Sequence, residues 1–196
     1  MKTIKIFFSL LVLLGFACNN SNTKSHDSTT AADSIDSDVQ KFMTEAASGG
    51  MMEIELGKIA ESQALHPRVK AFGAMLVADH TKASEELKTL AASKNISLPE
   101  AVSADHQKHI DELKALSGAD FDKAYIKMML KDHRKDINNF EDASMDAGDT
   151  DVKAFAAKTL PVLKAHLDSA KAINRAVKGS LNPEDLSDGV ETFPQR

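Results

Sequence analysis

Four long stretches of this chain carry apolar residues at the spacing of an α-helix, and none has the alternating pattern of a β-strand. They span about residues 37–65, 67–94, 119–147 and 150–178. His66-Pro67, Asn95 and Gly148 separate them, as expected for residues that end or begin helices. The linker 96–118 contains one short helical pattern that crosses back along the other helices. The sequence therefore predicts an all-α, up-down four-helix bundle with a short crossover helix between its second and third helices. Pro161 is expected to kink the last helix.

The N-terminus has the pattern of a secretory signal. Lys2 and Lys5 precede the apolar run IFFSLLVLLGFA, which ends at Cys18, the only cysteine. This run is shorter than the roughly 20 apolar residues of a membrane span. The segment 15–18, GFAC, resembles a bacterial lipobox, in which the cysteine receives a diacylglycerol before cleavage. We expect Cys18 to be lipidated; the alternative is an ordinary cleaved signal followed by an incidental cysteine.

Composition divides the chain into four parts. We expect a signal peptide at 1–17, the lipidated cysteine with a flexible Ser/Thr/Asn-rich tether at 18–37, the helical domain at 38–179 and a tail at 180–196. The chain has 24 basic against 29 acidic residues, a net charge of −5. An acidic chain without a basic stripe is not expected to bind nucleic acid, and its membrane contact would come from the lipid.

A short pattern occurs twice within the helical stretches. Residues 72–82 read FGAMLVADHTK and residues 125–135 read YIKMMLKDHRK, so Asp79-His80 corresponds to Asp132-His133. Two different helices therefore carry an imidazole at the same internal position, which indicates polar side chains near the middle of the bundle.

Spacing from the turns places two further residues at the same height. Glu53 and His80 each lie 13 residues from the His66-Pro67 turn. His133 and His166 lie 15 and 17 residues from the turn at 148–149. With a rise of about 1.5 Å per residue, all four residues converge near mid-bundle if they point inward.

A suitable ligand set for zinc, ferrous iron or copper consists of one carboxylate and three imidazoles. Here these are Glu53, His80, His133 and His166. Bundle cores are where helical proteins build such sites. Asp79 and Asp132 are alternative ligands, or they orient neighbouring imidazoles. The competing interpretation is a buried hydrogen-bond network without metal. Neighbours on a helix cannot both point squarely inward, so the sequence leaves the choice within each Asp-His pair open.

Other candidate ligands are weaker. Met52, Met75, Met128 and Met129 lie within about one turn of the predicted ligands, which would suit copper(I), but methionines at helical spacing usually fill cores. His106 and His109 in the linker would suit a surface metal or simple solvation. There is no phosphate-binding glycine loop, and no nucleophile motif of a known hydrolase class.

Four segments together resemble a bacterial family of exported, ferritin-like four-helix lipoproteins of unknown function, often labelled outer-membrane proteins. They are AASGGMMEIELGKIA, KAFGAMLVADHTKASEEL, GADFDKAYIKMMLKDHRKDINNFEDA and KAFAAKTLPVLKAHLDSA. The resemblance spans about 38–178 and implies a ferritin-like fold with Glu53, Asp79-His80, His133 and His166 as signature positions. Di-iron ferritin-like proteins carry a Glu-x-x-His pair on two helices, and this chain has none. A mononuclear site therefore fits better than ferroxidase chemistry.

Three functions follow as hypotheses. The first is a lipoprotein of the bacterial envelope, anchored to the outer membrane and facing the periplasm or the cell surface, which buffers or senses a transition metal. The second is a metal-free helical module that contacts envelope partners. The third is a metal-dependent redox or stress-protection enzyme, which would need an open coordination position and an access channel. The sequence favours a binding role over catalysis.

Overall fold

The computed structural model describes residues 29–179, and all of its regular secondary structure is helical. The five helices are α1 (Thr29–Gln63), α2 (Pro67–Ser93), α3 (Ala104–Lys114), α4 (Gly118–Asp146) and α5 (Thr150–Gly179). Within this range, strand-type pairing is limited to an isolated bridge between Ala64 and Gly118. The predicted all-α class is confirmed.

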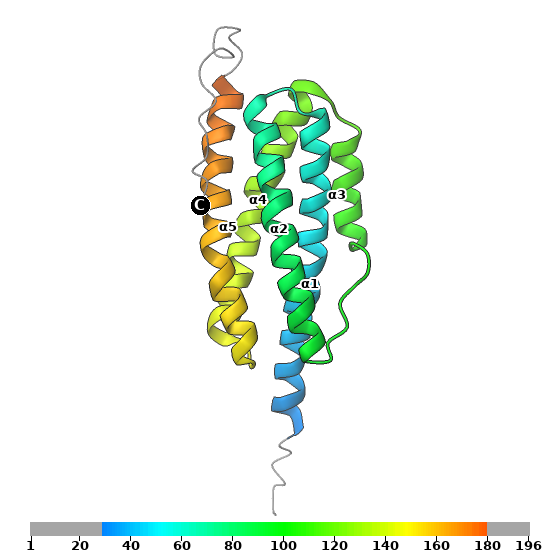
Figure 1. Ribbon diagram of the computed structural model, residues 1–196, viewed down its shortest axis with the longest axis vertical. Coiled ribbons are helices and arrows are strands. Elements are labelled where there is room, and N and C mark those ends of the chain that lie inside the picture. The colour runs from blue at the N-terminus through cyan, green and yellow to red at the C-terminus, as the bar shows by residue number, and fades with distance from the viewer. Residues whose placement is uncertain (1–28, 180–196) are drawn as a thin grey trace, which may run out of the picture.

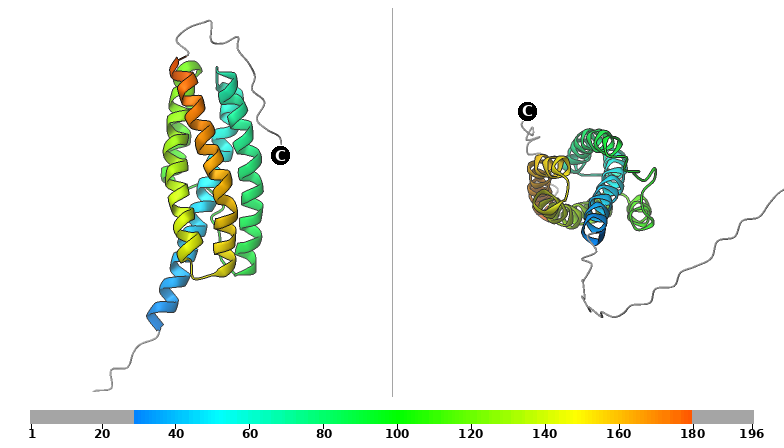
Figure 2. Two further views of the ribbon diagram at one scale, coloured as in Figure 1. Left: turned by 90° about the vertical axis from the view of Figure 1, so that its left-hand side faces the viewer. Right: turned by 90° about the horizontal axis from the view of Figure 1, so that it is seen from below.

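The four long helices pack side by side around a common axis, and α3 lies outside them against α1 (Figures 1 and 2). One hairpin is formed by α1 and α2, and the other by α4 and α5. Lys94 after α2 pairs with Asp149 before α5, so those two ends lie together. The linker and α3 return the chain to the opposite end, where α4 starts next to the α1–α2 turn. As a result α2 and α4 point in the same direction, and α3 occupies the place of the crossover helix expected between the second and third long helices.

Helix boundaries agree with expectation except at the first helix. It begins at Thr29, inside the segment predicted as a tether, whereas the sequence suggested a start near Ser37. Ala31 and Ala32 have high helix propensity, which favours this earlier start. The signal peptide, Cys18 and the tail 180–196 lie outside the described residues. No helix between residues 29 and 179 is both long and apolar enough to cross a membrane.

A buried carboxylate holds the α1–α2 turn against the start of α4. Asp122 accepts hydrogen bonds from the backbone N–H groups of Leu65 at 3.1 Å and His66 at 2.8 Å. His66 in turn caps α2, because its Nδ1 accepts from the backbone N–H of Arg68, and Pro67 fits the first turn. These contacts set the height of α4 relative to the first hairpin.

The core consists of two apolar clusters separated by a polar layer. One cluster includes Leu56, Phe72 and Tyr125, and the other includes Met43, Leu87 and Val152. The predicted polar residues of the four long helices lie at the level between these clusters. The fold therefore isolates them from solvent at both ends.

Candidate metal centre

Glu53, His80, His133 and His166 lie together in the interior, one from each long helix. Their exposed fractions are 1% for Glu53, 7% for His80, 0% for His133 and 1% for His166. The spacing argument from the turns therefore predicted the common height correctly. Whether these residues are metal ligands stays a prediction, which their geometry allows us to develop.

A chain of short polar contacts connects the four residues. Oε2 of Glu53 is 3.2 Å from Nε2 of His80, and Oε1 of Glu53 is 3.3 Å from Nδ1 of His133. Nε2 of His133 is 3.3 Å from Nδ1 of His166. Neither Oε1 of Glu53 nor Nε2 of His80 has a partner with hydrogen-bond geometry. Buried polar atoms without partners are unfavourable, so a bound cation that contacts both atoms would stabilise the centre.

His133 and His166 each have one ring nitrogen that forms a hydrogen bond away from the other histidine, and these hydrogen bonds assign their tautomers. Nδ1–H of His133 donates to the carbonyl of Met129 at 3.1 Å, because that oxygen can only accept. Nε2–H of His166 donates to the Asp79 carboxylate at 2.9 Å. In these tautomers Nε2 of His133 and Nδ1 of His166 both carry lone pairs, and these lone pairs face each other at 3.3 Å. Two facing lone pairs repel each other unless a cation lies between them.

Burial keeps protons off the imidazoles. Desolvation lowers the pKa of His133 to about 3, with a further lowering from His166. Desolvation and then the charges of His166 and His133 hold the pKa of His80 well below its ordinary value. The pKa of His166 is also lowered by burial, although Asp79 opposes that effect. The neutral imidazole is the form that binds metals, and all three histidines have it at neutral pH.

The carboxyl of Glu53 responds in the opposite direction. Burial raises its pKa well above the ordinary value, and the charges of Asp136 and Asp132 raise it further. In the absence of a cation, the raised pKa favours the protonated, neutral form of Glu53. A divalent cation would restore the ionised carboxylate, because the opposite charges attract strongly inside the protein.

The three histidines satisfy the basic distance requirement of a metal site. One nitrogen from each ring of His80, His133 and His166 lies within 4.8 Å of the others. Tetrahedral zinc with bonds of about 2.0–2.1 Å places its ligand atoms about 3.4 Å apart. The His133–His166 pair already has that separation, and His80 would have to move closer. Glu53 lies next to two of the three rings, so the residues fit a metal with nitrogen and oxygen ligands.

The two aspartates of the repeated pattern have different positions. Asp79 is not among the inward residues: its side chain is 43% exposed, and it orients His166 from outside. Asp132 is buried where α4 faces α3; desolvation raises its pKa, and His109 and His106 on α3 oppose that rise. In each Asp-His pair the histidine is therefore the residue that points to the centre.

The four methionines and His106, the weaker candidate ligands, contact other groups of the protein. Met52 and Met129 are buried in the apolar core, and Met75 and Met128 pack against it. His106 is half-buried on α3, where its Nδ1 lies 2.7 Å from the hydroxyl of Ser48.

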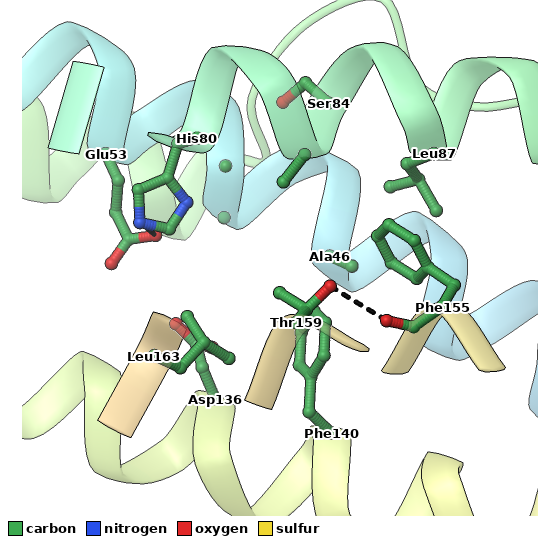
Figure 3. Close-up of a pocket in the computed structure, with 13 residues that line it drawn as sticks. Ala46, Glu53, His80, Ser84, Leu87, Asp136, Phe140, Phe155, Thr159 and Leu163 are labelled. Carbon is green, nitrogen blue, oxygen red and sulfur yellow. Dashed lines mark hydrogen bonds and ion pairs between the residues drawn. The ribbon is translucent and has the colours of Figure 1, made fainter. Parts of the chain in front are cut away.

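Two features near the centre were not predicted from the sequence. Asp136, three residues after His133, has its pKa raised to about 7 by burial, then by the charge of Asp132. It also lines a cavity of about 30 Å³ that reaches Glu53 and His80 (Figure 3). The hydroxyl of Tyr125 is buried without a hydrogen-bond partner. The position of Asp136, one helical turn after Asp132, could have indicated that Asp136 lies near the centre. The burial of the Tyr125 hydroxyl depends on packing, which the sequence does not show.

Residues 24–173 match the family described as "Domain of unknown function (DUF4142)". The chain belongs to this family. A comparison with curated proteins gave no match. Among solved structures, the chain is similar to the crystal structure of a DUF305 fragment from Deinococcus radiodurans, with a TM-score of 0.62 and 10% sequence identity. The alignment covers 70% of this chain and 95% of the fragment. At that identity the likeness concerns the fold alone.

Proposed function

We propose that this DUF4142 domain binds one transition-metal ion at mid-bundle through the imidazoles of His80, His133 and His166. The observation that carries the proposal is the 3.3 Å separation of Nε2 of His133 and Nδ1 of His166 in a buried site, where the other nitrogen of each ring already donates a hydrogen bond. A cation placed between these two atoms turns repulsion into two coordination bonds. It would also satisfy Nε2 of His80, which has no hydrogen-bond partner.

Glu53 completes the site as a fourth ligand or as the nearest negative charge. Its two oxygens lie 3.2 and 3.3 Å from His80 and His133, so a small rotation would bring one of them to a metal held by those rings. Three nitrogens and one carboxylate suit zinc, ferrous iron or copper. Asp79 and the Met129 carbonyl would orient His166 and His133 from outside, as hydrogen-bonded acceptors do in metalloproteins.

The cellular role that fits this site is metal buffering or sensing by a lipoprotein of the bacterial envelope. The N-terminal signal and the lipobox-like segment ending at Cys18 support anchoring to the outer membrane. The hairpin pairing of four long helices, with ligands projecting inward from each, supports a ferritin-like arrangement. The ligand set is too poor in carboxylates for the di-iron centre of ferritins.

Metal analysis of the chain from residue 19 onward, produced without signal or lipid, tests the proposal. We expect close to one metal ion per chain after loading with zinc or anaerobic ferrous iron, and a lower melting temperature after chelation, because a ligand bound only to the folded state stabilises it. His133→Gln combined with His166→Gln should remove both effects. Lys127→Gln, at an exposed position of α4, is the matched control. A melting temperature that ignores both metal and chelator in the wild type would refute metal binding.

The same experiment distinguishes metal binding from the metal-free alternative. If the centre is only a hydrogen-bond network in an interaction module, the histidine variants lose about 1–3 kcal/mol through unsatisfied partners. That loss would be equal with and without metal. The redox alternative requires a space beside the metal for a reactant.

A further inference from the structure

A small cavity adjoins the histidine cluster on one side. Its volume is about 30 Å³, and it lies between α1, α2, α4 and α5 (Figure 3). Glu53 and His80 form its wall at the metal centre, with Asp136 on α4 near them. The cavity thus begins at two residues of the proposed metal site and extends along the bundle away from them.

The cavity is polar at one end and apolar at the other. Beyond the three ionisable residues its wall is mainly hydrocarbon, with Ala46, Leu87, Phe140, Phe155 and Leu163 among the lining residues. Thr159 also lines it, but its hydroxyl already donates to the carbonyl of Phe155 at 2.8 Å (Figure 3). Water is held poorly by such a wall, because it needs two to four polar partners. The other polar groups that line the cavity are those of Glu53, His80 and Asp136 together with the hydroxyl of Ser84.

Glycines on α1 contribute to this space. Gly49 and Gly50 line the cavity with backbone instead of side chains. A Cβ added at Gly50 would come within 3.2 Å of the Ser84 hydroxyl, which lines the same cavity from α2. A larger residue in place of Gly50 would therefore narrow the cavity or close it.

We propose that this cavity holds a small uncharged molecule, of the size and polarity of dioxygen, next to the metal. The inference rests on the proposed metal site. Where Glu53 acts as the nearest negative charge and not as a ligand, the three imidazoles leave at least one coordination position open, and the cavity borders the site at His80 and Glu53. The accessible volume of about 30 Å³ favours a molecule of a few atoms, and the mainly hydrocarbon wall favours an uncharged one. The ligand class is therefore a neutral molecule of two or three atoms.

Nitric oxide tests the part of the inference that needs metal. It is a neutral diatomic molecule, and its binding to ferrous iron is followed by electron paramagnetic resonance and absorbance. The chain from residue 19 onward, loaded with ferrous iron under argon, should bind it saturably. Ala46→Leu and Ala83→Leu fill the cavity from α1 and α2. Because the added side chain occupies the space of the ligand, the affinity for nitric oxide should fall about tenfold or more, which corresponds to about 1.4 kcal/mol.

The matched control is Ala157→Leu, the same substitution at an exposed position of α5. It should bind nitric oxide like the wild type. Iron content and melting temperature are measured for every variant, so that a misfolded variant is recognised. If one cavity variant does not fold, the other provides the comparison. Equal nitric oxide affinity in the wild type and in a folded, iron-loaded cavity variant would overturn the proposal.

Xenon tests the cavity without any metal. Binding to metal-free protein should shift the methyl resonances of Leu87 and Leu163 saturably, and Ala46→Leu should abolish the shift while Ala157→Leu preserves it. Absence of xenon binding to the wild type would refute an accessible apolar chamber even if metal binds. Xenon binding by a protein that takes up no metal would instead refute the proposed function. Iron and xenon binding without nitric oxide binding would show that the cavity does not reach the metal, which also overturns the inference.

Discussion

The metal-free centre should make the stability of this domain depend on pH in a way that His133 controls. Burial lowers the pKa of His133 to about 3 in the folded state, whereas an unfolded histidine titrates near 6.5. Between these values the unfolded chain binds a proton that the folded chain does not. Because the folded pKa is the lower one, the contribution of His133 to stability decreases as the pH falls from about 6.5 toward 3.

The magnitude follows from the two pKa values. One histidine contributes a slope of about 1.4 kcal/mol per pH unit once the unfolded side chain is protonated. From pH 7 to pH 5 this amounts to about 2 kcal/mol for His133. Glu53 acts in the opposite direction, because its raised pKa makes the folded state bind the extra proton. The contribution of His133 is therefore isolated as the difference between the wild-type profile and that of His133→Gln.

Urea unfolding at pH 7, 6 and 5 in the presence of chelator measures this difference. We expect wild-type stability minus that of His133→Gln to become smaller by about 2 kcal/mol between pH 7 and pH 5. Lys127→Gln, exposed on the same helix, should keep the wild-type profile. Parallel profiles for the wild type and His133→Gln would refute the conclusion that the centre holds His133 neutral, since no proton would then be taken up on unfolding.

Three further predictions concern the fold and the anchor. Gly57→Ala should destabilise the domain by about 1–3 kcal/mol in urea melts, because its Cβ would lie 2.7 Å from the backbone oxygen of Gly73. Gly49→Ala, whose Cβ would meet only the His106 ring at 3.9 Å, should cause no such loss, and equal stability of the two variants would contradict this packing argument. Asp122→Ala should cost about 1–3 kcal/mol, since two backbone N–H groups of the α1–α2 turn lose their acceptor; an unchanged urea midpoint would refute that role. Cys18→Ser should release the full-length protein from bacterial membranes, and unchanged detergent partitioning would reject lipidation.

Helical periodicity and turn residues were sufficient to predict the class of fold. Pro67 and Gly148 mark turns that depend on local backbone geometry, so the ends of the long helices were readable within a few residues. Counting residues from those turns also placed the four central residues at one height, because the rise of a helix is constant. The start of α1 was misplaced, because residues 29–36 lack the apolar periodicity from which helices were predicted.

The tertiary structure decided which residue of each Asp-His pair points inward. Neighbours on a helix differ by about 100° in direction, and only the packing of four helices determines which direction is the interior. Asp79 therefore lies outside the centre and orients His166, while Asp132 turns toward α3. The opposed lone pairs of His133 and His166 and the cavity beside Glu53 arise from side chains far apart in sequence. They depend on distances between helices, which no local pattern of residues encodes.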